Sequence, residues 1–149
     1  MRLVIQRVSQ ADVQIDNKIV GQIDVGLLLL AGITATDSEE DIHWISKKVV
    51  QMRIFSDEAG KMNKNVVDIK GSILLISQFT LMASTKKGNR PSFIEAAPPH
   101  LAIPLYEQLI KQLELDLGQK IQTGMFGADM QVSLTNDGPV TIILDSFSR

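Results

Sequence analysis

The stretch VGLLLLAGI, residues 25–33, is an apolar run whose only interruptions are Gly26 and Gly32. A continuous apolar run of this length, bounded by glycines, is typical of a strand buried on both faces. A helix that crosses a bilayer needs about 20 apolar residues, so this run is too short for one. It predicts a central strand, around which the rest of the fold is arranged.

The residues before this run predict an opening hairpin. LVIQRVSQADVQID, residues 3–16, is rich in β-branched residues but alternates irregularly, as a strand with a bulge does. Residues 16–18, DNK, have turn chemistry and lead into IVGQID, residues 19–24. Two paired strands are therefore expected ahead of the central one.

Two helices are predicted beyond the central strand. TDSEEDIHWISKKVVQM, residues 36–52, can be capped by Asp37 or Ser38 and has acidic residues in its first turn. The second helix is predicted from Pro98 or Pro99 to about Leu117, and Gly118 ends it. The predicted buried positions are Ile42, Ile45, Val49 and Met52 in the first helix, and Leu101, Leu105, Leu109, Leu113 and Leu117 in the second.

The remaining segments complete the predicted fold. Residues 56–71 have the composition of a loop, 72–81 predict an apolar strand with a polar end, and 82–93 predict an irregular basic loop. Residues 120–135 and 139–147 predict two closing strands. This order predicts a mixed α/β (α+β) domain over residues 1–149. We expect antiparallel-rich sheets that form a two-sheet or barrel-like core, with two main helices packed outside.

The last of these segments, SLTNDGPVTIILDSF at residues 133–147, contains a proline where a strand is expected. Asn136-Asp137-Gly138 is good turn chemistry, and Pro139 can open a returning strand, so a plain hairpin is one interpretation. The other is that Gly138-Pro139 is itself a functional part. The local sequence leaves both open.

Composition and charge exclude several classes of protein. The net charge of −2 argues against a surface that binds nucleic acid everywhere, and the absence of Cys excludes disulfides and thiolate catalysis. His43 and His100 fit no metal-binding spacing, so we expect no metal and no cofactor. Arg2 and Arg7 interrupt the apolar N-terminal residues, which is unlike a secretory signal. A cytoplasmic protein with no membrane partner is expected.

Three polar segments are candidates for chemistry. SQFT, residues 77–80, follows a buried strand and can either orient a substrate or satisfy backbone groups at the strand end. KKGNRPSF, residues 86–93, carries Lys86, Lys87 and Arg90, which can meet phosphates or form a solvated loop. The third segment is Gly138-Pro139.

Together these segments resemble the D-aminoacyl-tRNA deacylase family, also called the D-tyrosyl-tRNA deacylase family. The resemblance rests on MRLVIQRVSQADV, LLISQFTL, KGNRPSF, GMFGADMQV and NDGPVT, which occur in this order between residues 1 and 141. It implies a homodimer that hydrolyses the ester between a D-amino acid and the 3′ end of tRNA, with its active sites at the subunit interface. It also implies that tRNA mischarged with glycine is a substrate.

The resemblance also implies roles for particular residues. Gly138-Pro139 would carry a cis peptide bond and enter the partner's active site, where main-chain carbonyls reject an L-residue by steric clash. We expect Arg7 to hold this unit in place. The catalytic segment would be Ser77, Gln78, Phe79 and Thr80; adenine would bind Phe126 and Met130, and tRNA phosphates would meet Lys86, Lys87 and Arg90.

An aminoacyl ester is already activated, so positioning and oxyanion stabilisation can suffice for its hydrolysis. The backbone N–H groups around Gln78 and Phe79 would face the ester carbonyl. Thr80 is one candidate nucleophile, but no base is expected beside it, so we favour assistance by the tRNA 2′-hydroxyl. Core packing remains an alternative role for Met130. A non-catalytic nucleic-acid-binding module and an esterase for another small acyl ester remain alternative functions.

Overall fold

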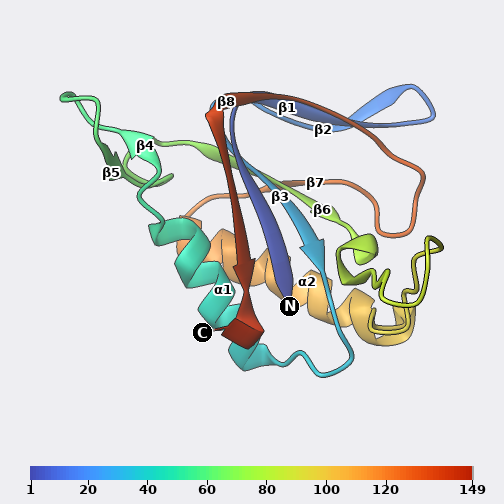
Figure 1. Cartoon of the computed structure of the whole chain (residues 1–149). Helices are drawn as coiled ribbons and strands as arrows, with labels where there is room; N and C mark the ends of the chain where they lie inside the picture. The colour runs from blue at the N-terminus through green and yellow to red at the C-terminus, as the bar shows by residue number, and fades with distance from the viewer. Residues whose placement is uncertain (149) are drawn as a thin grey trace.

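The chain folds around one mixed sheet, which a computed structural model shows for residues 1–148 (Figure 1). In this range the sheet has six strands, beside a two-stranded sheet, two long helices and two short 3-10 turns. The large sheet contains β1 (Arg2–Ile15), β2 (Lys18–Ile23), β3 (Gly26–Gly32), β6 (Ser72–Ser77), β7 (Gln122–Thr123) and β8 (Gln131–Asp145). The other elements are β4 (Phe55–Ser56), β5 (Met62–Lys64), α1 (Glu39–Gln51), α2 (Pro99–Leu117), η1 (Phe79–Met82) and η2 (Ser146–Ser148).

Strand β3 is the central strand that the apolar run predicts. It pairs antiparallel with β1 on one side and parallel with β6 on the other. Leu27 and Leu29 pack into the core beneath the helices, whereas Leu28 packs into a second core on the opposite face. The strand is therefore buried on both faces, which explains why its sequence is apolar without alternation.

The large sheet curls until its two edge strands, β2 and β7, approach each other. A Cβ on Gly21 of β2 would lie only 2.9 Å from the carbonyl oxygen of Thr123 in β7. The second core fills the curl, and both helices cover the other face of the sheet (Figure 1). The predicted α+β fold with a barrel-like core and two outer helices is confirmed.

The opening hairpin and the first helix are also confirmed. β1 and β2 are antiparallel with a register shift at Val13 and Gln14, and Asp16 and Asn17 form the turn with positive φ. Ser38 is the N-cap of α1, and the Asp41 carboxylate accepts hydrogen bonds from the backbone N–H and the hydroxyl of that residue. Asp37 has another role, because it forms a buried ion pair with the amino group of Met1.

The predicted buried stripe of α2 is partly wrong. Leu101 is 40% exposed and Leu105 is only half-buried, while Ala102 and Tyr106 are buried in their place. A step of four residues turns an α-helix by about 40° more than a full turn, so a row of every fourth residue drifts around the axis. The buried face stays aligned by mixing steps of three and four: Ala102, Tyr106, Leu109, Leu113 and Leu117.

The strand predicted over residues 72–81 ends at Ser77, and residues 79–82 form η1 instead. Two further boundaries differ from the prediction. Residues 120–135 contain only β7 and the start of β8, and residues 124–130 between them form a loop rather than a strand. Residues 56–71, predicted as a loop, include part of the short β4–β5 ladder. In both places a few ladder hydrogen bonds decide the structure, and such short elements leave little periodicity in a sequence.

The hairpin interpretation of residues 133–147 is wrong. β8 runs through Gly138-Pro139 without reversing and pairs antiparallel with β1 on both sides of it. Gln6 pairs with Thr141 and Val8 pairs with Asn136, so Arg7 alone faces residues 137–140. The turn-forming residues therefore make a large bulge within one strand, where the missing N–H of Pro139 breaks no ladder.

Neither helix in the described part of the chain is long and apolar enough to cross a membrane.

Candidate active site

The polar end of β6 is fixed by the strand beside it. Ser77 pairs with Ala31 of β3, and the backbone N–H of Gln78 donates to the Ala31 carbonyl at 2.7 Å. The chain then turns into η1, which packs over the end of β3. Gly32 permits this close approach, since a Cβ there would lie 3.0 Å from both Leu81 Cβ and Met82 Cε.

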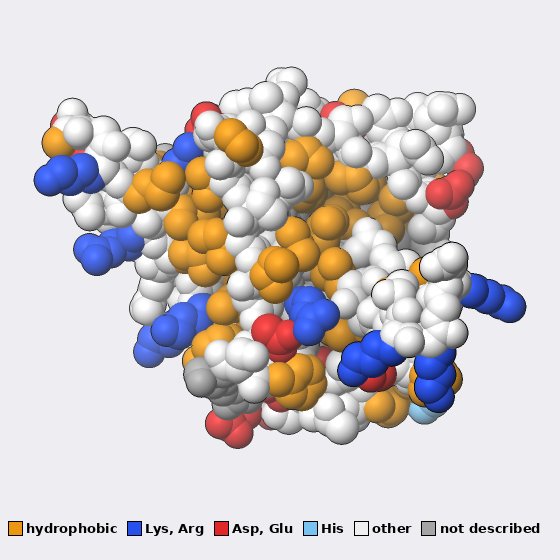
Figure 2. Space-filling model, viewed as in Figure 1, with side chains coloured by type: hydrophobic (Ala, Val, Ile, Leu, Met, Phe, Trp, Pro, Cys, Tyr) orange, Lys and Arg blue, Asp and Glu red, His pale blue; other side chains and the backbone are white. Residues whose placement is uncertain are grey.

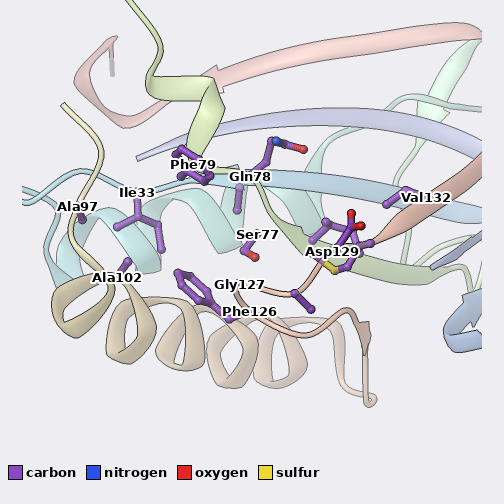
Figure 3. A pocket seen from close by; sticks show the side chains of 14 residues that line it. Ile33, Ser77, Gln78, Phe79, Ala97, Ala102, Phe126, Gly127, Asp129 and Val132 are labelled. Carbon is purple, nitrogen blue, oxygen red and sulfur yellow. The ribbon is translucent and has the colours of Figure 1, made fainter. Parts of the chain in front are cut away.

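A pocket of about 300 Å³ opens at this strand end (Figure 3). Ser77, Gln78 and Phe79 form one wall, and the loop after β7, from Phe126 to Met130, forms the opposite wall. The pocket is thus a cleft between a rigid strand end and a loop, with polar groups on an otherwise apolar lining. The other lining residues are Ala31, Ile33, Ile76, Ala97, Ala102 and Val132.

Tyr106 of α2 supports both walls of this pocket. Its ring packs edge to face on Phe126, with centroids 5.7 Å apart and an interplanar angle of 62°. Its hydroxyl donates to the Leu75 carbonyl of β6 at 2.9 Å, and the Gly124 N–H donates to the same carbonyl at 3.3 Å. Burial raises the pKa of Tyr106, because the phenolate would lose its hydration.

Met130 packs against the second core and also reaches the pocket. It lies so close over Gly124 that a Cβ at this position would require the Met130 side chain to move. Phe126 and Met130, predicted as the adenine-binding pair, thus lie on one wall of the same pocket.

Thr80 lies outside the pocket lining and is exposed. Its hydroxyl oxygen accepts a hydrogen bond from the side-chain amide of Gln78 at 2.5 Å. An amide N–H cannot take the hydroxyl proton, so this contact does not activate a nucleophile. Neither His43 nor His100 lines the pocket; His43 is exposed on α1 with its Nδ1 2.8 Å from the Glu39 carbonyl.

Only part of the predicted oxyanion site is available. The Gln78 N–H already bonds to Ala31 and so cannot also face an ester carbonyl in this arrangement. Within residues 1–148, the Phe79 N–H donates to no acceptor. The backbone donor at the pocket wall is therefore that of Phe79, at the start of η1.

Gly138-Pro139 lies apart from this pocket. Its peptide bond is cis, both residues are exposed, and neither lines the pocket of the same chain. Buried Arg7 holds the bulge from below: its Nε donates to the Asp137 carbonyl at 3.0 Å and its Nη1 to the Ile54 carbonyl at 2.6 Å.

The neck of the bulge is closed by Asn136. Its side-chain oxygen accepts from the Val140 N–H at 2.8 Å, and its amide donates to the Thr141 hydroxyl at 3.0 Å. The exposed Gly-Pro unit is thus fixed on a rigid base.

Lys86, Lys87 and Arg90 lie in the exposed loop between η1 and α2. Ser84 and Ser92 close this loop with backbone hydrogen bonds of 2.8 and 2.9 Å. Within residues 1–148 none of the three cations forms an ion pair. Lys and Arg side chains gather at the lower right of Figure 2, where Figure 1 places this loop.

The sequence prediction missed several residues that line or support the pocket. Asp129 lines it, and its signal was present in the quoted motif GMFGADMQV. Tyr106 could not be found, because a tyrosine in a helical pattern indicates only core packing. The apolar residues Ile33, Ala97 and Ala102 come from three separate segments that only the fold brings together. Across residues 1–148, no group of three or more His, Cys, Asp and Glu side chains could hold a metal ion.

Comparisons with known proteins agree along the whole chain. Residues 4–145 match the family model described as D-Tyr-tRNA(Tyr) deacylase. Curated proteins named D-aminoacyl-tRNA deacylase from Flavobacterium psychrophilum and Cytophaga hutchinsonii are 61% and 63% identical; each match covers 100% of this chain and 99% of the relative.

Two solved structures are also similar. One, described as c-Myc DNA Unwinding Element Binding Protein, is 39% identical with a TM-score of 0.90, and the match covers 97% of this chain and 98% of that one. The other, a probable eukaryotic D-amino acid tRNA deacylase, has a TM-score of 0.83 over 96% of this chain and 97% of its own. Its 15% identity supports the fold alone.

Proposed function

Because the chain belongs to the D-Tyr-tRNA(Tyr) deacylase family, we propose that it hydrolyses D-aminoacyl-tRNA in the pocket at the end of β6. The chain is a hydrolase that acts on a carboxylic ester. Water adds to the ester carbonyl carbon, the bond to the ribose oxygen breaks, and that oxygen takes a proton. The observation that carries the proposed site is the pocket itself, since Ser77–Phe79 and Phe126–Met130 face each other across it.

The two walls of the pocket suit the two ends of such a substrate. Phe126 and Met130 offer apolar surface for the terminal adenine, and aromatic faces stack on bases. The opposite wall offers the Phe79 N–H for the oxygen that becomes negatively charged when water adds. A preorganised N–H aimed at that oxygen stabilises the transition state more than the substrate.

Thr80 is not the nucleophile in this proposal. Its hydroxyl accepts from Gln78, and neither histidine lines the pocket, so no base prepares it for attack. The 2′-hydroxyl next to the ester belongs to the substrate, and the covalent structure of the ribose places it beside the reacting carbonyl. It can orient the attacking water without any further catalytic side chain.

Chirality is sensed by the Gly138-Pro139 unit of a partner subunit. Main-chain carbonyls beside the bound α-carbon would leave room for hydrogen on one side only, so an L-residue clashes and a D-residue fits. Glycine carries hydrogen on both sides and passes the same test, so tRNA mischarged with glycine is also cleaved.

A partner is required because the unit is exposed and lies outside its own chain's pocket. Exposed apolar residues on β8 and just after it, Leu134, Ile143 and Phe147, offer surface for a homodimer. The active sites would then lie at the subunit interface. The compartment that suits this substrate is the cytoplasm.

One experiment tests the reaction and its stereochemistry together. The protein is incubated with D-Tyr-tRNA, L-Tyr-tRNA and Gly-tRNA, and release of the free amino acid is followed. We expect release from the first and third and none from the second. Release from both tyrosyl esters would indicate a general esterase, and binding without release a nucleic-acid-binding module. Light scattering on the same sample tests the dimer.

A further inference from the structure

Phe79 and Phe93 form an exposed aromatic pair at the edge of the pocket, and the mechanism above uses the backbone N–H of Phe79 but neither of the two rings. Their ring centroids are 5.2 Å apart, with an interplanar angle of 71°. Phe79 is 56% exposed and Phe93 36%, and the neighbouring Ile94 is 91% exposed. Apolar side chains gathered at the mouth of a pocket mark a surface that contacts a ligand.

The position of Phe93 is fixed on both sides. Before it, Ser92 pairs with Ser84 through two backbone hydrogen bonds. After it, the Ala97 N–H donates to the Ile33 carbonyl at 2.9 Å, and Ala96 bridges to Thr34. Phe79 is fixed in turn by η1, directly after the Gln78–Ala31 hydrogen bond. The backbone that carries both rings is therefore held by hydrogen bonds, which suits the pair to act as a preorganised platform.

The charge next to this platform is positive. Lys86, Lys87 and Arg90 lie in the loop that ends at Ser92, and Glu95 is the one acidic residue in this segment. Cations beside exposed aromatic rings are the combination that binds single-stranded nucleic acid: the rings stack on bases and the cations neutralise phosphates. A second copy of this chain, with a net charge of −2, offers no such density of negative charge.

We propose that Phe79 and Phe93 form a stacking platform for the unpaired nucleotides that precede the terminal adenosine of the tRNA substrate. This inference rests on the proposed function, which puts the terminal adenosine against Phe126 in the pocket. The strand must leave the pocket over its rim, and Phe79 is the aromatic residue of that rim on the side of the basic loop. Lys86, Lys87 and Arg90 then neutralise the phosphates that follow.

The test compares two minimal substrates that differ only in these nucleotides: the 3′-D-tyrosyl ester of adenosine and that of the trinucleotide CCA. In Phe93→Ala, we expect KM for the trinucleotide ester to rise about tenfold with kcat unchanged. Both constants for the adenosine ester should stay at wild-type values. Phe93→Leu keeps an apolar side chain but no ring and should behave like Phe93→Ala. The matched control is Leu115→Ala, a 74% exposed residue on α2.

Equal losses on both substrates would overturn the platform, because Phe93 would then act on the pocket. Unchanged constants on both would overturn it as well. A lower mass of Phe93→Ala in light scattering would assign the pair to an interface between copies. A second measurement requires no hydrolysis: the affinity of the trinucleotide CCA without an amino acid for wild type and for Phe93→Ala is measured by calorimetry. Thus, failure of wild type to cleave either ester would refute the proposed function, and this binding measurement would still decide the platform.

Discussion

At the residue scale, Arg7 shows how one side chain fixes an exposed bulge. It is the only β1 residue opposite residues 137–140, and it is buried beneath them. Its guanidinium reaches the Asp137 carbonyl and the Ile54 carbonyl at once, which a lysine cannot do with the same planar geometry. The sequence suggested this partnership only through the family resemblance, because nothing in the local pattern around Arg7 points to residue 138.

Gly138 leaves no room for a side chain. Its φ is +132°, and an added Cβ would lie 2.8 Å from Val140 Cγ2 and 2.9 Å from Arg7 Nη2. We expect Gly138→Ala to lose about 1–3 kcal/mol of unfolding free energy and most of its turnover of D-Tyr-tRNA. Denaturant unfolding and single-turnover assays measure the two effects.

The control is Gly60→Ala. Gly60 also has a positive φ, +77°, but no neighbour within 4 Å of an added Cβ. It should lose some stability and keep its turnover. Full activity with intact L/D discrimination in Gly138→Ala would contradict the role proposed for this residue.

Thr80→Ala tests covalent catalysis. Because the hydroxyl accepts from the Gln78 amide and has no base beside it, we expect kcat to stay within about threefold of wild type. The measurement is kcat at saturating D-Tyr-tRNA, with Thr80→Ser as the control. A variant that binds normally but has lost a thousandfold or more in rate would restore Thr80 as the nucleophile.

At the scale of elements, β3, α1 and the β1–β2 hairpin were predictable because burial repeats over many residues in each. The course of β8 was not predictable, since Asn136-Asp137-Gly138 has the chemistry of a turn and only pairing with β1 on both sides shows that the chain continues. The assembly of the pocket was likewise not predictable from the sequence. Ser77–Phe79 and Phe126 were found in separate motifs, but the pairing of β6 with β7, and the Tyr106 ring on Phe126, bring the two walls together.

Tyr106 of α2 also makes the stability of the folded chain depend on pH. Burial holds the pKa of this phenol above its ordinary value of 10.0, so above about pH 10 the unfolded chain loses a proton that the folded chain keeps. The contribution of Tyr106 to stability is complete below pH 10 and falls by about 1.4 kcal/mol per pH unit above it.

The test compares the unfolding free energies of wild type and Tyr106→Phe between about pH 9 and 11, a range that brackets the ordinary tyrosine pKa of about 10. At neutral pH the variant should lose about 1 kcal/mol, from the missing hydrogen bond to Leu75. Above pH 10 the two curves should converge. Tyr106 is the only tyrosine, so tyrosinate absorbance reports it directly. Parallel curves would show that the phenol titrates normally.

For the whole molecule, tRNA binding is expected to depend on where the charges lie rather than on the net charge. A chain of net charge −2 carries three cations without ion-pair partners, within residues 1–148, on the loop beside the pocket. We expect weak binding of tRNA that depends on salt and little on base sequence. Replacing Lys86, Lys87 and Arg90 by Gln should lower the slope of log K against log salt concentration by about 2, as expected for three single-strand phosphate contacts.

The matched control for this measurement replaces Lys18, Lys61 and Lys70, which lie in loops or at strand ends of other segments. It removes the same charge and should leave the slope nearly unchanged. Equal slopes for both triple variants would indicate that only the total charge matters.

The Gly-Pro bulge and the pocket are separate features of one chain, and that separation makes genetic complementation possible. In the proposed dimer, Gly138→Ala would damage the unit that a protomer inserts into its partner's active site, and Phe126→Ala would damage the protomer's own pocket. Mixed and re-annealed, two such inactive preparations should form hybrids in which one of the two centres is assembled wholly from undamaged halves. Random pairing would then restore about a quarter of the wild-type rate from two samples that are each inactive alone.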